Sequence, residues 1–257
     1  MKGYFAVGLG MVCLYHVAQG ALYNGNGDTS FGGAIGNGNL ALTDNGTTVS
    51  GTITKGGGSF ADVLVIYIDS KAGGFATTRN FTDTSTSLTR AISGFSSMGR
   101  GIADFVSPFT ADYAIAIRPT SPGDGKLFQL VNNGDLVAVS SVNLSPLNTV
   151  SSSTYTFSFN LADIGAPGVS FKIETTYIAQ SGFRSLESFE SLSGFTGWDT
   201  VTFDTFHTYT LAPVPETTNA SLAILGGIAL CTGGFARARR YFKKPNQRTL
   251  RQTSWSL

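Results

Sequence analysis

The chain has 257 residues, of which 32 are Gly, 19 are Phe and 9 are Tyr, and only 13% are charged. This composition is typical of many short strands joined by tight turns, and it excludes a coiled coil, a helical bundle and a disordered chain. Two His and two Cys are too few for zinc fingers or a disulfide scaffold.

The net charge of +1 conceals a separation of charge along the chain. Seven basic residues crowd the C-terminus from Arg237 to Arg251, whereas all 16 acidic residues lie between Asp28 and Glu216. Residues 21–236 carry nine Lys and Arg against these 16 acids, a net charge of −7. Because an acidic body repels phosphate backbones, we expect no nucleic-acid partner for it.

The N-terminus predicts a secretory signal peptide over residues 1–20. Lys2 provides a short basic start, and residues 4–17 form an almost wholly apolar run. Ala18 and Gly20 are small residues of the kind that signal peptidases require, so we expect cleavage after Gly20 or close to it. The alternative is a buried N-terminal strand or helix.

Residues 21–212 predict one exported β-sandwich domain. The unbroken apolar run Val63–Ile68 is typical of a central strand covered on both faces, and Tyr113–Ile117 predicts a second strand. Apolar and polar residues alternate in three later segments, which predicts strands with one solvated face. These segments are Tyr155–Leu161, Val169–Tyr177 and Val201–Leu211.

Clusters of Gly, Asn, Asp and Ser separate the predicted strands. Asn45-Gly46 and Gly134-Asp135 are signals for tight hairpins. Ten to thirteen strands without a long helix predict an all-β fold, an antiparallel β-sandwich of the jelly-roll type. Arg184–Leu192 is expected to form one helical turn or two.

The segment Ala61–Asp69, followed by Gly73-Gly74, resembles the strand before an acidic loop in DOMON-like and family 9 carbohydrate-binding modules. Residues 157–161 and 169–175 are similar to the closing strands of those modules. Such modules bind sugars or haem on a sandwich. The resemblance therefore implies carbohydrate binding and assigns no ligand residue.

Few residues of the body suit catalysis. His207 occupies an alternating position in a predicted strand, and no Gly-x-Ser-x-Gly nucleophile elbow accompanies it. Glu174, Glu187 and Glu190 are candidates for the paired carboxylates of a glycosidase, but we interpret them as solvated side chains. We predict a protein that is not an enzyme, and the alternative is a secreted glycan-active enzyme that uses Glu and Asp carboxylates.

Trp198, the one Trp of the body, is the candidate sugar-binding residue together with Asp199, because sugar C–H groups stack on aromatic faces. The alternative role for Trp198 is to fill the end of the sandwich. No cofactor is expected, and Ca²⁺ is the one metal considered, since it prefers hard oxygen ligands. Its candidate ligands are Asp62, Asp69 and Asp112, near strand ends, with solvated loop acids as the alternative.

The uncharged run Ser221–Ala236 predicts a short transmembrane helix over about residues 220–236. At about 1.5 Å per residue, the run spans roughly 24 Å of a hydrocarbon core about 30 Å thick. The basic residues after it place the tail, residues 245–257, in the cytoplasm and the acidic body outside. The stop-transfer residues are Arg237, Arg239 and Arg240, and a buried C-terminal helix is the alternative.

Val214-Pro215-Glu216 stands just before this run, and over residues 213–244 the chain resembles the PEP-CTERM family of exported bacterial proteins. The sorting signal of that family joins a Pro-Glu motif, a short Gly-rich transmembrane helix and an Arg-rich stop. Thr217 stands where the family has a second Pro. The resemblance implies processing by exosortase, a membrane transpeptidase-like enzyme, in bacteria that make exopolysaccharide and biofilm matrix.

These features together predict an exported, exosortase-sorted protein of the cell envelope or extracellular matrix. We expect it to be anchored transiently in the inner membrane, with its C-terminus in the cytoplasm. Its expected role is structural or adhesive, with extracellular polysaccharide as the partner. An unprocessed single-span membrane protein is a further alternative.

Overall fold

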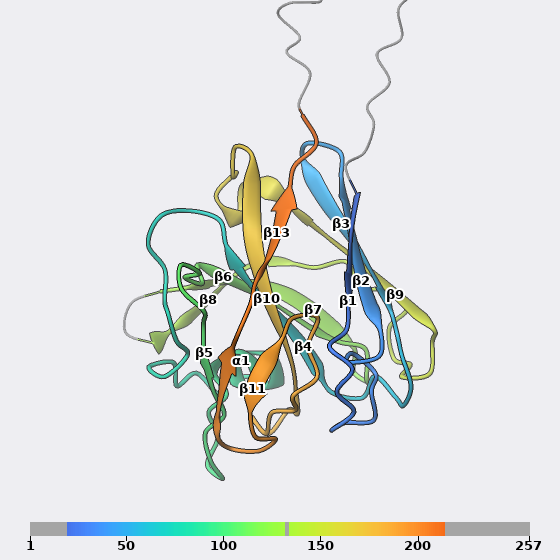
Figure 1. The fold of residues 1–257 in the computed structure, drawn as a ribbon, viewed down its shortest axis with the longest axis vertical. Coiled ribbons are helices and arrows are strands. Elements are labelled where there is room, and N and C mark those ends of the chain that lie inside the picture. Colours follow the sequence, from blue (N-terminus) through green and yellow to red (C-terminus); the bar gives the residue numbers. More distant parts are fainter. Residues whose placement is uncertain (1–19, 132–133, 214–257) are drawn as a thin grey trace, which may run out of the picture. The chain divides into compact units, whose positions relative to one another are not determined.

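The structure is a computed structural model that describes residues 20–131 and 134–213 (Figure 1). The predicted signal peptide up to residue 19, the sorting motif and the transmembrane helix lie outside the described residues. Within the described part, no helix is both long and apolar enough to cross a membrane.

The described domain has a sandwich-like all-β fold built from three sheets, and its two large sheets are antiparallel throughout. The four-stranded sheet has the order β1 (Gly20–Asn24), β2 (Asn39–Asp44), β3 (Thr48–Thr54), β9 (Thr154–Asn160). The six-stranded sheet has the order β13 (His207–Thr210), β10 (Ser170–Ile178), β4 (Val63–Asp69), β6 (Tyr113–Arg118), β7 (Asp124–Leu130), β8 (Leu136–Ser141). The small sheet consists of β11 (Leu192–Gly194), β12 (Thr200–Phe203) and β5 (Ile102–Asp104), and the helical elements are α1 (Ser87–Ser93) and the 3₁₀ turn η2 (Leu161–Ile164).

Strand β4 lies at the centre of the domain, as its apolar run predicts. Leu64 and Ile66 point into the core between the two large sheets. Val65 and Tyr67 point into a second core, which the six-stranded sheet forms with α1 and the small sheet. Both faces of β4 are therefore buried, which confirms the prediction from its sequence.

Strand β10 differs from its prediction of one solvated face. Glu174, Thr175 and Thr176 are all fully buried, because β10 lies beside β4 and the second core covers its other face. The alternation in β9 does correspond to one buried and one solvated face. The predicted segment 201–211 divides into β12 and β13, which belong to different sheets.

Both predicted hairpins are present. Gly46, with a φ of 83°, lies in the turn between β2 and β3, and Gly134, with a φ of 79°, precedes β8. Such positive φ values favour Gly because it lacks a Cβ atom. The sequence therefore locates these two turns correctly.

The helix prediction over 184–192 is wrong: this segment contains no helix and runs beside residues 174–178 of β10, which β13 does not pair. The amide of Tyr177 donates to the carbonyl of Glu187, and the amide of Phe189 donates to Thr175 Oγ1. The one α-helix of the described residues is instead α1, which Thr86 caps at its start and Gly94 ends.

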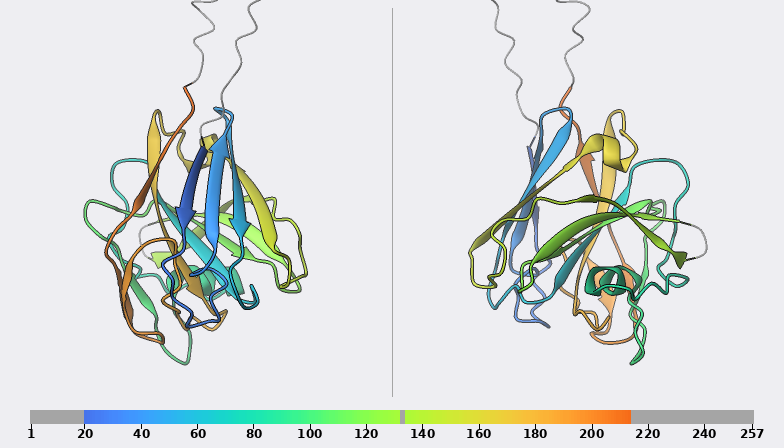
Figure 2. Two further views of the ribbon diagram at one scale, coloured as in Figure 1. Left: turned by 45° about the vertical axis from the view of Figure 1, so that its right-hand side comes forward. Right: turned by 180° about the vertical axis from the view of Figure 1, so that it is seen from behind.

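The two ends of the described domain lie together at one end of the fold. Gly20 pairs with Thr43, and the amide of Ala212 donates to Asp44 Oδ2 at 3.0 Å. Figures 1 and 2 show two loops at the opposite end: the hairpin of residues 95–100 and the connection of residues 194–199 between β11 and β12.

Candidate functional site

Three large apolar side chains are exposed on these two loops. Met98 is 63% exposed, Phe195 is 74% exposed and Trp198 is 40% exposed. We call these three residues the tip patch. Apolar side chains gathered at one end of a domain are typical of an interaction surface rather than of scattered surface residues.

Trp198 is held in place by its neighbours while it stays partly open to solvent. Its ring covers Gly99 so closely that an added Cβ atom there would lie 2.4 Å from Trp198 Cγ. Its ring meets the ring of Phe183 edge to face, with centroids 5.1 Å apart. Trp198 therefore packs against Gly99 and Phe183 and still presents part of its aromatic surface to solvent.

The loop that carries Trp198 is attached to the core through Arg184. The amide of Gly197 donates to the carbonyl of Arg184 at 2.9 Å, and the reverse hydrogen bond measures 3.0 Å. The fully buried guanidinium of Arg184 donates to the carbonyl of Gly101 at 2.8 Å and to Thr176 Oγ1 at 3.2 Å. Arg184 thus holds the loop of Trp198 through its backbone, and its side chain joins Gly101, which follows the hairpin 95–100, to strand β10.

Asp199, the second predicted sugar-binding residue, is exposed beside Trp198. Its Oδ1 accepts a hydrogen bond from the amide of Thr200 at 2.7 Å, and its carbonyl accepts one from the amide of Ile102 at 3.1 Å. The structure therefore places both predicted residues at the tip, as an aromatic surface next to a carboxylate. This combination suits a sugar, which offers C–H groups for stacking and hydroxyl groups as donors.

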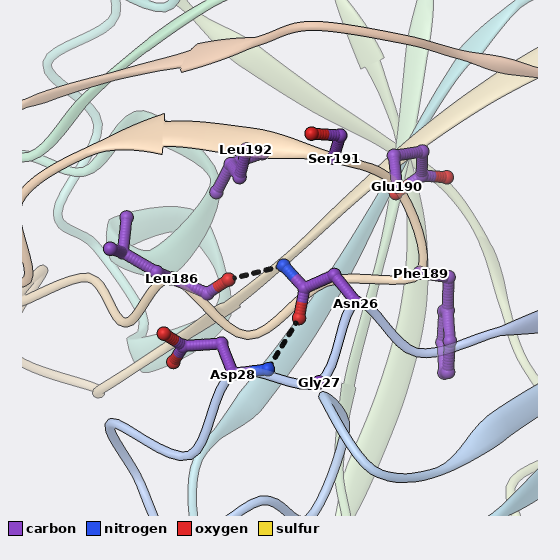
Figure 3. Close-up of a pocket in the computed structure, with 8 residues that line it drawn as sticks. All are labelled: Asn26, Gly27, Asp28, Leu186, Phe189, Glu190, Ser191 and Leu192. Carbon is purple, nitrogen blue, oxygen red and sulfur yellow. Dashed lines mark hydrogen bonds between the residues drawn. The ribbon is translucent and has the colours of Figure 1, made fainter.

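Apart from the tip patch, a hollow of about 470 Å³ lies beside residues 26–28 (Figure 3). Asn26 Nδ2 donates to the carbonyl of Leu186 at 2.7 Å, and Asn26 Oδ1 accepts from the amide of Asp28 at 3.1 Å. Figure 3 shows the carboxylates of Asp28 and Glu190 on either side of Asn26, and they do not point toward one another. This hollow therefore lacks the facing pair of carboxylates that glycoside hydrolysis uses.

Glu190, in the wall of this hollow, is only 2% exposed. Its Oε2 accepts hydrogen bonds from Thr175 N at 2.9 Å, Thr175 Oγ1 at 2.6 Å and Ser188 Oγ at 2.8 Å. Its Oε1 is buried and has no hydrogen-bond partner among the described residues. Burial raises the pKa of Glu190, although these hydrogen bonds and the charge of His207 oppose the shift.

Glu174 is the second buried acid with an unpaired oxygen. Its Oε1 accepts from the amide of Val106 at 3.3 Å, and its Oε2 has no partner in the described part of the chain. Burial, and then the charge of Glu190, raise the pKa of Glu174 to about 9. Glu174 is therefore a neutral acid at pH 7, and it does not line the hollow beside Asn26.

Glu187 is fully buried and binds a Gly-rich loop from the N-terminal part of the domain. Its Oε1 accepts from the amides of Phe31 and Gly33, at 2.7 and 2.9 Å. Its Oε2 accepts from the amides of Ile35 and Gly36, at 2.9 and 3.3 Å. Four aligned N–H groups form an anion-binding loop, and a carboxylate of the same chain occupies it.

The interpretation of Glu174, Glu187 and Glu190 as solvated side chains is wrong. The second core covers the outer face of β10, and the segment 185–190 packs along the part of β10 that β13 does not pair. Alternation of apolar and polar residues along one strand does not reveal whether a further layer of the fold covers its polar face. The Gly-rich spacing of residues 32–38 was the one signal in the sequence that a loop here surrounds an anion.

His207 has a structural environment. Its ring stacks on the ring of Tyr23, with centroids 4.3 Å apart. Its Nε2–H donates a hydrogen bond to the carbonyl oxygen of Phe189 at 2.8 Å. Burial, followed by the charge of Glu190, raises the pKa of Tyr23 to about 12. These contacts fix His207 between β1 and the segment that precedes β11.

The three candidate Ca²⁺ ligands do not lie together. Asp62 and Asp69 stand at opposite ends of β4, roughly 23 Å apart at about 3.3 Å per residue. Asp69 forms an ion pair with Lys172 at 2.8 Å, and Asp112 Oδ2 accepts from the amides of Ser70 and Lys71. Within residues 20–131 and 134–213, no group of three or more His, Cys, Asp or Glu side chains is arranged to hold a metal ion.

The predicted sorting and stop-transfer residues lie outside the described residues. They are Val214, Pro215, Glu216, Arg237, Arg239 and Arg240. No model of a known protein family matches the chain, and neither a curated protein nor a solved structure matches it.

Proposed function

We propose that this protein is an exported, non-enzymatic component of the cell envelope or matrix, with a structural or adhesive role, and that its domain binds polysaccharide at the tip patch. The observation that carries the proposal is the position of Trp198, which is partly exposed, fixed on Gly99 and next to Asp199. Both ends of the described domain lie at the opposite end from the loop between β11 and β12 that carries Trp198 (Figure 1).

The finer assignment of the fold, a jelly-roll-like sandwich, belongs to the same proposal. Two antiparallel sheets that enclose one core support it. Such sandwiches present loops at their ends, and the tip patch is formed by loops of this kind.

The binding proposal is tested with a glycan array probed by the purified full-length chain, with and without Ca²⁺. We expect Trp198→Ala to lose binding to the glycans that the unchanged protein retains. Leu22→Ala is the control, because Leu22 is 62% exposed on β1 and lies outside the tip. If no glycan binds, or if both variants bind like the unchanged protein, the proposal of a sugar-binding tip is wrong.

The export proposal is tested separately by mass spectrometry of the protein isolated from its native host. The Val214-Pro215-Glu216 motif and the uncharged run after it support processing near Glu216. We expect an N-terminus near residue 21 and a C-terminus near Glu216. A C-terminus at Leu257 would contradict the sorting proposal and favour an unprocessed single-span protein.

A further inference from the structure

A pocket of about 620 Å³ adjoins the tip patch and is lined by basic, hydroxyl-bearing and apolar residues. Arg90 and Gln180 lie in its wall with Ser97 and Ser181, and Phe95 and Met98 supply apolar surface. No Asp or Glu lines it. Met98 belongs to both the pocket and the tip patch, and the next residue, Gly99, supports the ring of Trp198.

The positive charge of Arg90 has no carboxylate partner in the described structure. Its Nη1 donates to the carbonyl of Gln180 at 3.2 Å, and its Nη2 donates to the carbonyl of Thr84 at 3.4 Å. Both hydrogen bonds are long, and neither carbonyl neutralises the guanidinium. The ion pairs among the described residues involve Arg79, Lys126 and Lys172 only.

Arg100 adds a second guanidinium without a carboxylate partner at the same hairpin. It lies over the ring of Phe95, with 5.1 Å between its Cζ and the ring centroid, and its Nη2 donates to the carbonyl of Phe81. Its Nε is buried and has no partner among the described residues. Burial, and then the charge of Arg79, lower the pKa of Arg100, so its surroundings favour the approach of an anion.

Positive charge at this pocket contrasts with the acidic domain around it. A neutral sugar needs an aromatic surface and hydrogen-bond partners for its hydroxyl groups, and Trp198 and Asp199 supply these already. The guanidinium of Arg90 in a pocket wall without acids, with that of Arg100 over the ring of the lining residue Phe95, favours a planar anion with two acceptor oxygens, such as a carboxylate. The volume of about 620 Å³ is within the range of about 300–1,000 Å³ for pockets that hold small ligands.

We propose that this pocket binds the carboxylate-bearing sugar, a uronic acid, of an acidic polysaccharide whose neighbouring sugar stacks on Trp198. This inference rests on the proposed polysaccharide-binding function and specifies its ligand class. Arg90 supplies the charge in the pocket wall, and Arg100, over the ring of Phe95, adds positive charge beside it. Ser97 and Ser181 supply hydroxyl groups, and Met98 connects the pocket to the aromatic surface.

The test is isothermal titration calorimetry of the full-length chain in detergent micelles with polygalacturonate, alginate and hyaluronate. Each polymer is compared with its carboxyl-reduced form, which keeps the sugar rings and loses the charge. We expect the acidic form of at least one polymer to bind about tenfold or more tightly than its reduced form, because charge-assisted hydrogen bonds are the stronger ones. Raising NaCl from about 20 to about 200 mM should weaken that binding.

Two variants locate the effect in the pocket. Arg90→Gln should remove the preference for the acidic polymer, and Ser97→Asp should weaken acidic binding about threefold or more by repulsion. Ser97 is exposed, so the second variant keeps the fold if Arg90→Gln does not. Ser153→Asp is the matched control, because Ser153 is exposed just before β9 and is not among the pocket residues.

Each remaining outcome rejects a defined part of the account. Equal binding of acidic and reduced polymers, both lost in Trp198→Ala, overturns the uronic-acid inference and leaves the sugar-binding function intact. A preference for acid that neither Ser97→Asp nor Arg90→Gln changes overturns the assignment to this pocket. If none of the polymers binds in either form, both the inference and the proposed function fail.

Discussion

Replacing Glu174 by Gln should stabilise the protein at neutral pH. Glu174 is fully buried, one of its oxygens has no partner among the described residues, and its pKa rises from 4.5 to about 9. The folded state therefore prefers the protonated acid, whereas the unfolded chain ionises it at pH 7. The resulting contribution to stability is complete below pH 4.5 and is lost as the pH rises toward about 9.

The size of the effect follows from the two pKa values. Between pH 4.5 and pH 7 the shift costs about 1.4 kcal/mol per pH unit, or about 3 kcal/mol in the free energy of unfolding. Gln cannot ionise, so Glu174→Gln should recover about 2–3 kcal/mol at pH 7 and almost nothing at pH 4.5. Urea unfolding, followed by circular dichroism at a series of pH values, measures this difference.

The control is Asp135→Asn, which removes an exposed negative charge and should show no such pH dependence. The decisive observation is the slope of the stability difference against pH. If Glu174→Gln and the unchanged protein differ by the same amount at every pH between 4.5 and 9, then Glu174 is not a buried neutral acid and the reasoning fails.

Two further substitutions test the packing of the domain, both by urea unfolding. Glu187→Gln should lower the free energy of unfolding by about 2–4 kcal/mol, because one amide oxygen cannot replace two carboxylate oxygens that accept four amide N–H groups. An unchanged urea midpoint would show that Glu187 does not have this role. Gly51→Ala should cost about 1–3 kcal/mol, since an added Cβ atom would lie 2.2 Å from the ring of Phe157, and a neutral result would show that the ring moves freely.

The sequence predicts those features of the fold that local patterns determine. The unbroken apolar run identifies β4 as central, because a strand that is buried on both faces has apolar side chains at successive positions. Asn45-Gly46 identifies a hairpin, because a turn with positive φ favours Gly. Helix α1 also had a signal that the prediction missed. Thr86 and Thr89 form a capping box, and Gly94 ends the helix three residues after Ala91.

Other features depend on contacts between distant segments, so one segment alone does not reveal them. Glu174 has the polar spacing of a solvated strand face, yet a second layer covers it. Arg184 has no local signal for full burial, since its partners Gly101 and Thr176 come from other segments. The sequence identifies Trp198 and Asp199 as candidates, but the arginine-lined pocket beside them arises only from the folded arrangement.

The most direct test of the account is a map of where a polysaccharide touches the domain. Hydrogen–deuterium exchange of the full-length chain, with and without a glycan that it binds, reports contacts along the whole chain. We expect protection to concentrate in residues 95–100 and 194–199, the two loops of the tip. Protection confined to the hollow beside Asn26, or to the edge strand β8, would contradict the central claim that this protein binds polysaccharide through Trp198.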